Sequence, residues 1–313
     1  MFTNSGNHTL EYRFDSEILR IEAWGPNAIR VRATYEPTFP SEDWALTERV
    51  PAPPETMLGI SEKKGYIING DIKAHINERG KLTITNSKGK ILVEEFMRTR
   101  VDVHDPRCSA LRIVPRQFVP RQGTDSWHLT ARFEAVHPDE KIYGMGQYQQ
   151  PYLDLKGADI ELAQRNSQAS IPFAVSSEGY GFLWNNPAVG RAVFGKNMTT
   201  FEALSTRVLD YWVVAGDTPR DIVRAYGKVT GTVPEMPEYG LGFWQCKLRY
   251  QTQDEILEVA REHKRRGLPM DVIVVDYFHW PKEGEWKFDP TFWPDPGTNT
   301  SILAFSLNLL LLV

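Results

Sequence analysis

Residues 252–276 read TQDEILEVAREHKRRGLPMDVIVVD, and this stretch decides the fold of the C-terminal part of the chain. It opens with a capping box, because Thr252 and Glu255 can each accept a hydrogen bond from an N–H group that the start of a helix leaves unpaired. Gly267 and Pro269 end the pattern, so the sequence predicts a helix between Thr252 and Gly267. The apolar residues of this helix recur at the spacing of one helix face; they are Ile256, Val259 and Ala260.

A strand is predicted on each side of this helix. Residues 271–275 are an almost continuous apolar run, which is typical of a strand buried in a parallel sheet. Residues 240–244, Gly-Leu-Gly-Phe-Trp, form a short apolar strand candidate before the helix. The three elements make one β-α-β unit, which by itself could begin either a Rossmann-like sheet or an eight-stranded barrel.

The first two hundred residues instead predict many short strands. Ile29, Val31 and Ala33 alternate with Arg30 and Arg32, and this period of two indicates a half-buried strand. Similar runs follow, separated by turns that contain Asn and Gly. They lie at 72–76, 82–84, 111–114, 126–133, 171–175 and 181–184. Short strands at this spacing favour a large antiparallel β-sandwich.

A second helix is predicted at 219–230, because Thr218 is a good N-cap and Gly231 ends the pattern. Pro234 and Pro237 follow this helix and mark a domain boundary. The predicted organisation has three parts: a β-sandwich at 1–233, the first β-α-β part of a barrel at 234–296, and an atypical apolar tail at 297–313.

Composition argues against several classes of partner. The 36 Lys and Arg residues are nearly balanced by 40 Asp and Glu residues, and a net charge of −4 creates no field for nucleic acid or an anionic membrane. Cys108 and Cys246 are far apart in sequence, so we interpret them as buried free thiols. No secretory signal is visible at the start, and we expect a cytoplasmic location. The sequence gives no indication of the oligomeric state.

Motifs for the common cofactors are missing from the sequence. Gly240-Leu-Gly lacks the third glycine of a dinucleotide fingerprint, and no phosphate-binding loop, zinc spacing or nucleophile elbow occurs. We therefore expect no cofactor and no metal.

The candidate site lies where the predicted strand 271–275 ends, at Asp276. Barrel enzymes bind ligands at the carboxyl ends of their strands, and a carboxylate among aromatic side chains suits a sugar. Trp244 ends the preceding predicted strand and is expected at the same rim, with Arg249 shortly after it. The alternatives are that Asp276 caps the next turn and that Arg249 is a surface residue.

Several segments, in order, resemble glycoside hydrolase family 31. They are Tyr143-Gly-Met-Gly-Gln147, Ile171-Pro-Phe173, Glu178-Gly-Tyr-Gly-Phe-Leu-Trp184 with Asn185-Asn-Pro187, Pro237-Glu-Tyr-Gly-Leu-Gly-Phe-Trp-Gln245, Leu268-Pro-Met-Asp-Val-Ile-Val-Val-Asp276, Phe288-Asp-Pro290 and Trp293-Pro-Asp-Pro296. The resemblance covers roughly residues 10–296. It implies a mainly β fold, in which a galactose-mutarotase-like β-sandwich precedes the truncated start of a (β/α)8 TIM barrel.

The resemblance also implies an α-glucosidase or α-xylosidase type of activity on an α-linked oligosaccharide or glycoside. It assigns substrate binding to Asp276, with Tyr277, Phe278, Trp244 and Arg249 on the same rim. A loop of the sandwich, within 147–166, is expected to point toward the site and favours the α-xylosidase type.

Such enzymes retain configuration, which requires two carboxyl groups about 5–5.5 Å apart. In the family these groups lie on later barrel strands, so we assign no catalytic residue here and expect the chain to be inactive. Two other functions stay open: a non-catalytic carbohydrate-binding or interaction module, and a mutarotase-type epimerase, for which no His and Glu pair is evident. The tail 297–313 carries no charge and is expected to fit no barrel element.

Overall fold

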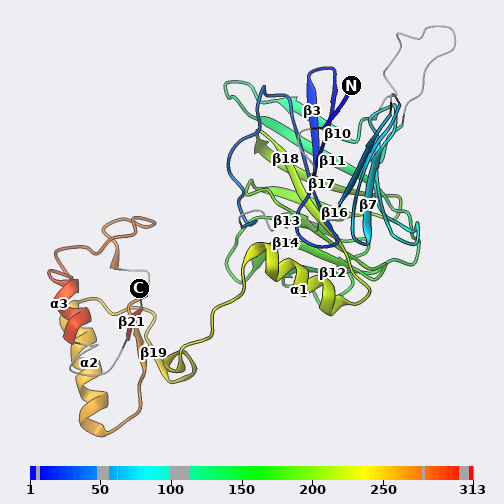
Figure 1. The fold of residues 1–313 in the computed structure, drawn as a ribbon. Coiled ribbons are helices and arrows are strands. Elements are labelled where there is room, and N and C mark those ends of the chain that lie inside the picture. Colours follow the sequence, from blue (N-terminus) through cyan, green and yellow to red (C-terminus); the bar gives the residue numbers. More distant parts are fainter. Residues whose placement is uncertain are drawn as a thin grey trace. The chain divides into compact units, whose positions relative to one another are not determined.

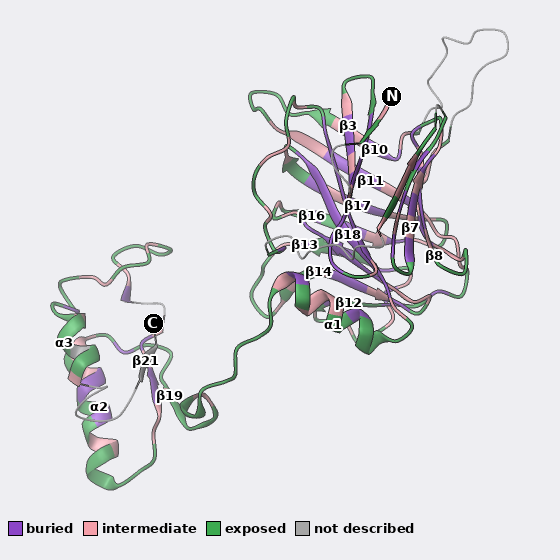
Figure 2. Ribbon diagram, viewed as in Figure 1, coloured by how far each residue is buried: buried purple, intermediate pink, exposed green. Residues whose placement is uncertain are grey.

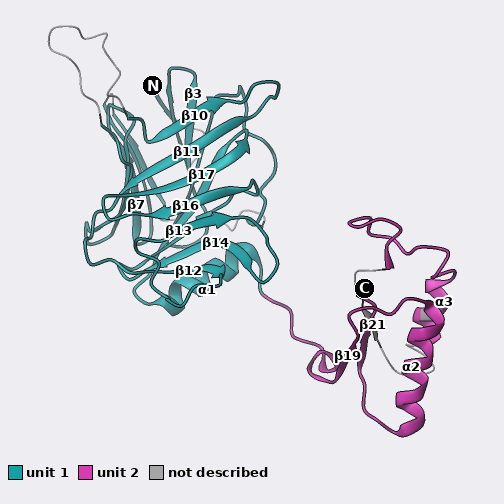
Figure 3. Cartoon of the chain, turned by 180° about the vertical axis from the view of Figure 1, so that it is seen from behind, with its two compact units in different colours: residues 1–232 teal, residues 233–313 magenta. Residues whose placement is uncertain are grey.

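The computed structural model describes residues 1–4, 8–47, 56–61, 63–98, 113–276, 279–302 and 310–312. The chain divides into two compact units, Met1–Thr232 and Val233–Val313, which Figure 3 shows in different colours. This division falls beside the predicted boundary at residues 233 and 234. Of the helices in the described ranges, none is both long enough and apolar enough to cross a membrane.

The described strands of unit 1 form three antiparallel sheets, and one helix packs against the largest of them (Figure 1). The largest sheet has the order β1-β2-β3-β4-β18-β15-β14-β12, the second β10-β11-β17-β16-β13, and the third is the meander β5 to β9. The elements are β1 (Phe2–Asn4), β2 (Thr9–Phe14), β3 (Glu17–Ala23), β4 (Ala28–Thr34), β5 (Met57–Ile60), β6 (Gly65–Asn69), β7 (Ile72–Ile76), β8 (Leu82–Asn86), β9 (Ile91–Glu94), β10 (Arg116–Pro120), β11 (Trp127–Glu134), β12 (Ile142–Gln147), β13 (Asp159–Leu162), β14 (Ala169–Ser176), β15 (Tyr180–Trp184), β16 (Gly190–Phe194), β17 (Met198–Thr206), β18 (Leu209–Ala215) and α1 (Pro219–Thr230).

Most predicted strands are confirmed. β7 has alternating burial and forms a hairpin with β8. The turn between them is closed by the Asn77 side chain, whose Oδ1 accepts hydrogen bonds from the N–H groups of Arg79 and Lys81. The strand predicted at 111–114 is wrong where it can be checked. Ile113 forms only an isolated bridge to Arg98, and the strand begins at Arg116; residues 111 and 112 lie outside the described ranges.

The reading of β4 as half-buried is also wrong, because all seven of its residues are buried. β4 lies between β3 and β18, in the middle of the largest sheet. Arg30 and Arg32 are tolerated there because each faces carboxylates: Arg30 pairs with Asp210, and Arg32 with Glu22. A buried charge requires such pairing, and sequence alternation alone does not reveal it.

The core of unit 1 lies between its sheets, where Figure 2 shows the buried segments of the strands. Aromatic rings fill its centre: Phe182 stacks on Tyr211 with the ring centroids 5.0 Å apart, and Phe133 meets both of these rings edge-on. Such ring pairs contribute packing energy beyond the area they bury.

The motif Tyr143-Gly-Met-Gly-Gln147 forms β12 and contains an irregularity in its pairing with β14. Gly144, Met145 and Gly146 have φ angles of +98°, +64° and +93°. A Cβ atom on Gly146 would lie 2.1 Å from the carbonyl oxygen of Ala169. The glycines therefore permit both the left-handed backbone and the close approach of β14.

The predicted helix 219–230 is confirmed as α1. Thr218 Oγ1 accepts a hydrogen bond from the Asp221 N–H group at 3.2 Å, and Gly231 follows the last helical residue with a φ of +94°. Ile222 and Val229 are buried against a second apolar cluster that includes Trp212.

Unit 2 contains one parallel sheet and its helices. Its elements are η1 (Glu238–Leu241), β19 (Trp244–Cys246), α2 (Gln253–Arg266), β20 (Val272–Val274), α3 (Pro296–Ser301) and β21 (Leu310–Leu312). The capped helix and the strand after it are confirmed: Thr252 Oγ1 accepts from the Glu255 N–H group, and Gly267 has the left-handed conformation of a helix end. α2 packs on the sheet through Ile256 and Ala260, in a cluster with Ile273 and Val275.

Two predictions for unit 2 need correction. Gly240 and Leu241 belong to the 3-10 helix η1, and the strand begins only at Trp244. Gly240 and Gly242 explain the difference, because glycine favours a turn over a strand. The apolar tail does supply barrel elements: α3 begins at Pro296, and β21 pairs in parallel with β20. A short apolar run suits a buried parallel strand even without a pattern of charges.

Candidate functional site

The candidate site lies at the carboxyl ends of β19 and β20. Trp244 is paired with Val272, and Cys246 with Val274, so the two parallel strands end at Cys246 and Val274. Asp276 follows two residues later. In barrel folds this edge of the sheet carries the ligand-binding loops.

Asp276 leaves the strand in an uncommon conformation, with a φ of +69°. Its Oδ2 atom lies 3.5 Å from the Sγ atom of Cys246, which donates from the neighbouring strand. Its backbone carbonyl lies 2.6 Å from Nδ1 of His279. Asp276 is therefore held at the strand edge through both its side chain and its backbone. A non-glycine residue with this φ persists only where its surroundings enforce it, which is a frequent feature of ligand sites.

Cys246 is exposed, so its prediction as a buried thiol is wrong. It stands at the last position of β19 and points to the same edge as Asp276. Partial burial raises the pKa of the Cys246 thiol, and the hydrogen bond to the Asp276 carboxylate and the charge of that carboxylate raise it further. The thiol is therefore neutral at neutral pH, and its one proton is shared between two acceptors, Oδ2 of Asp276 and the carbonyl oxygen of Lys247 at 3.4 Å.

Trp244 occupies the first position of β19, not its end as predicted. Its side chain is 43% exposed, and its backbone is opposite Val272, at the amino end of the short pairing. The strand starts four residues later than the apolar run suggested, and this shift places Cys246, not Trp244, beside Asp276.

Arg249 lies in the segment between β19 and α2 and is exposed. The next residue, Tyr250, is buried, and its hydroxyl lies 3.1 Å from Nε2 of Gln245. This contact fixes the start of the loop to β19. Tyr277 and Phe278, the other two predicted substrate-binding residues, lie outside the described residues.

An aromatic loop follows Asp276 and supports it. His279 is buried, with its ring centroid 4.9 Å from that of Phe288, and its carbonyl accepts the Asp289 N–H group at 2.8 Å. The rings of Trp280 and Trp286 lie 5.2 Å apart. Sequence reasoning missed the supporting role of His279, although its position three residues after Asp276 in an aromatic run was a usable signal.

The arrangement offers a carboxylate acceptor beside a thiol and near aromatic residues. In the described ranges, no cluster of three or more His, Cys, Asp and Glu side chains could hold a metal ion. A carboxylate at a strand edge can accept hydrogen bonds from neighbouring hydroxyl groups of a sugar ring. The site therefore suits binding of a hydroxyl-rich ligand.

The sandwich segment 147–166 lies in unit 1, between β12 and β14. Tyr148 anchors it, because its hydroxyl lies 2.8 Å from Oγ of Ser170 and 3.0 Å from the carbonyl oxygen of Glu161. Tyr152 and Leu153 are exposed at its tip. Its predicted approach to Asp276 stays a prediction.

Both units match known family profiles. Residues 18–191 match the glycosyl hydrolase 31 N-terminal galactose mutarotase-like domain, and residues 233–307 match the glycosyl hydrolases family 31 TIM-barrel domain. The second match extends to residue 307, into the tail that was predicted to be foreign to the barrel, and it includes α3.

Relatives and solved structures agree with these profiles. The chain is 50% identical over 297 residues to an uncharacterized family 31 glucosidase of Pseudescherichia vulneris, covering 92% of this chain and 55% of that protein. It is 38% identical over 182 residues to an alpha-xylosidase of Saccharolobus solfataricus, covering 55% of this chain and 25% of that enzyme. A crystal structure of a GH31 alpha-xylosidase from a soil metagenome, complexed with xylose, superimposes with a TM-score of 0.83 at 48% identity. That match covers 99% of this chain and 46% of the xylosidase, so the chain spans about half the length of the first relatives it matches.

Proposed function

Because the chain belongs to glycoside hydrolase family 31, we propose that its residues are the sugar-binding start of a retaining α-glycosidase that acts on terminal α-linked xylosyl or glucosyl groups. The observation that carries this proposal is the position of Asp276, held at the carboxyl edge of the sheet by Cys246 and His279. The similarity to two α-xylosidases supports a preference for xylosyl over glucosyl groups.

Asp276 has the role of a binding residue in this proposal. An ionised carboxylate in this position accepts two hydroxyl groups of the ring, and each charge-assisted hydrogen bond adds about 1.5–3 kcal/mol. Cys246 lies beside the carboxylate and limits the space on that side of the sugar.

We further propose that residues 1–313 do not hydrolyse a glycoside by themselves. A retaining mechanism needs a nucleophile and an acid/base about 5–5.5 Å apart. β19 is followed by Lys247 and Leu248, and β20 by Val275 and Asp276, so Asp276 is the one carboxylate at these two strand ends.

The test is calorimetric titration of the purified chain with p-nitrophenyl α-xyloside and p-nitrophenyl α-glucoside, together with a colour assay for released p-nitrophenolate. We expect saturable binding, tighter for the xyloside, and no release above the buffer blank. Asp276→Asn should abolish binding. Asp254→Asn is the matched control, because Asp254 is an exposed carboxylate in the first turn of α2.

Two results would contradict the proposal. Release of p-nitrophenolate that Asp276→Asn abolishes would place the chemistry within these residues. Equal binding by the wild type and Asp276→Asn would remove Asp276 from the sugar site.

A further inference from the structure

Trp44 is an exposed aromatic residue of unit 1 in a conformation that such residues seldom adopt. Its φ is +55°, in the left-handed region, and its side chain is 54% exposed. Aromatic side chains disfavour this region because Cβ crowds the following carbonyl group. Exposure of a large indole to water is a second unfavourable feature at the same residue.

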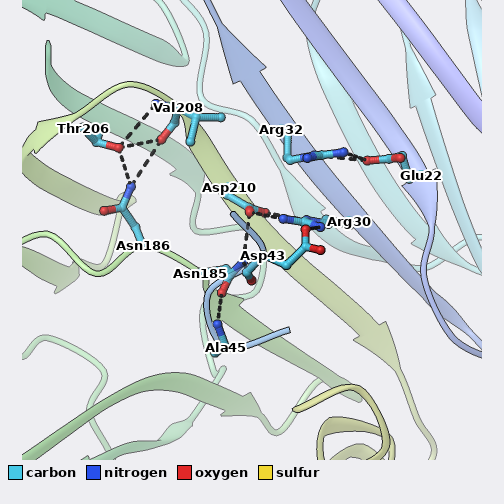
Figure 4. A network of polar contacts seen from close by, with 10 residues as sticks. All are labelled: Glu22, Arg30, Arg32, Asp43, Ala45, Asn185, Asn186, Thr206, Val208 and Asp210. Carbon is cyan, nitrogen blue, oxygen red and sulfur yellow. Dashed lines mark hydrogen bonds and ion pairs between the residues drawn. The ribbon is translucent and has the colours of Figure 1, made fainter. Parts of the chain in front are cut away.

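A buried ion-pair network fixes the residue before Trp44 (Figure 4). Arg30 is fully buried, with Nη2 2.6 Å from Oδ2 of Asp210 and Nη1 2.6 Å from Oδ1 of Asp43. Asp210 is itself 1% exposed. The side chain of Asp43 is therefore attached to the middle of the largest sheet.

Asn185 fixes the backbone on both sides of Trp44. Its Nδ2 donates to the carbonyl of Asp43 at 3.0 Å and to Oδ2 of Asp210 at 2.9 Å, and its Oδ1 accepts the Ala45 N–H group at 3.2 Å. Figure 4 shows Asp43, Ala45 and Asn185 together around this contact. The amide of Asn185 thus bridges the residues before and after Trp44.

The following residues are anchored as well. Leu46 is buried in the cluster under α1, and the Thr47 N–H group donates to the carbonyl of Val229 at 2.7 Å. Trp44 is the large exposed side chain within a segment whose backbone is held at Asp43, Ala45 and Thr47. Within the described part of the chain, no ring or cation packs on its indole.

Strained residues persist when the surrounding structure over-determines them, and they gather at ligand clamps. Here the anchored segment presents a flat apolar ring to solvent, and two exposed polar residues, Ser41 and Glu42, come shortly before it in the sequence. An exposed indole matches the apolar C–H face of a pyranose ring, and polar side chains in the same segment suit the hydroxyl groups at the rim of that ring. A protein partner would instead require a larger apolar patch.

We propose that Trp44 is the platform of an accessory saccharide-binding site on the sandwich, which takes a gluco- or xylo-configured pyranose ring of an oligosaccharide. This inference takes one thing from the proposed function, namely that the ligand is a saccharide. The platform lies in unit 1, whereas Asp276 lies in unit 2, so each can be removed separately.

The test is calorimetric titration of the full chain with maltoheptaose and with xyloglucan heptasaccharide. Trp44→Ala should weaken the binding of at least one of them by about tenfold, as expected for the loss of one aromatic contact. Trp44→Phe should restore part of it. Phe14→Ala is the matched control, because Phe14 is also an exposed aromatic residue of unit 1, at 56%. Circular dichroism and the melting temperature check that each variant is folded.

The outcomes separate this inference from the proposed function. Loss of heptasaccharide binding in Trp44→Ala, with binding of p-nitrophenyl α-xyloside intact, supports the platform. Equal binding by Trp44→Ala and the wild type, or no saturable binding of either heptasaccharide, overturns it and leaves Asp276 untouched. A Trp44→Ala variant that changes only its elution volume in size-exclusion chromatography also overturns it, because Trp44 would then contact protein.

Discussion

Replacement of Arg30 by methionine should destabilise unit 1 strongly. The change removes the bonds from Nε and Nη2 to Asp210, at 3.0 and 2.6 Å, and the bond from Nη1 to Asp43. Asp210 then stays buried with Asn185 as its remaining donor among these residues. Removing one partner of a buried ion pair typically costs about 3–5 kcal/mol, because the other charge is left without compensation. Asp43 adds little, since it is 39% exposed.

Urea denaturation of the full chain, followed by circular dichroism in the β-sheet region, measures this loss. Arg165→Met is the matched control, because Arg165 pairs with Glu161 on the surface and should change the free energy of unfolding very little. The double variant Arg30→Met/Asp210→Leu should recover part of the loss, because it removes both charges.

The pH dependence gives a second readout of the same variant. Burial is the largest influence on Asp210 and raises its pKa, against the opposing effect of Arg30. Without Arg30 the pKa rises further, so the folded state holds the proton more tightly than the unfolded state does. The destabilisation by Arg30→Met should therefore shrink as the pH falls through that raised pKa toward the lower pKa of the unfolded state. A loss no larger than that of Arg165→Met, or one that grows on acidification, would refute the reasoning.

Three further predictions concern single residues. Asp276→Asn should speed alkylation of Cys246 by iodoacetamide at pH 8 in a Cys108→Ser background, because the carboxylate raises the pKa of the thiol; an unchanged rate would mean that the two side chains do not interact. Thr252→Ala should lower the stability of unit 2 by about 1 kcal/mol through loss of the N-cap, whereas Thr252→Asn should keep it, as thermal melts of both variants would reveal. Trp44→Gly should melt no lower than the wild type, because glycine adopts a positive φ without strain; a clear drop in melting temperature would show that the indole stabilises the fold.

The sequence predicted correctly those elements that are determined by residues close together in the chain. The hairpin of β7 and β8 is set by alternating residues and the Asn77 turn, and α2 by its Thr252 cap. β4 was misread because the burial of Arg30 depends on Asp210, which lies 180 positions away in sequence. No pattern within a short window contains that information.

The candidate site also combines a residue that the local sequence predicts with one whose position depends on distant pairing. Asp276 was predicted from the end of its own strand, and the structure places it at that edge. Cys246 was missed because its position depends on where β19 begins, and short parallel strands have weak boundary signals. Its register against β20 is fixed by pairing between strands, which emerges only in the folded unit.

The pairing of β4 with β18 also has a consequence for how the chain is made. β4 ends at Thr34, whereas its partner spans Leu209–Ala215, so nearly the whole sandwich must be synthesised before the largest sheet can close. Until then β4 has an open edge, on which Arg30 lacks the counter-charge of Asp210. The largest sheet can therefore close only after β18 has left the ribosome, whereas the meander β5 to β9 consists of neighbouring strands that can pair earlier.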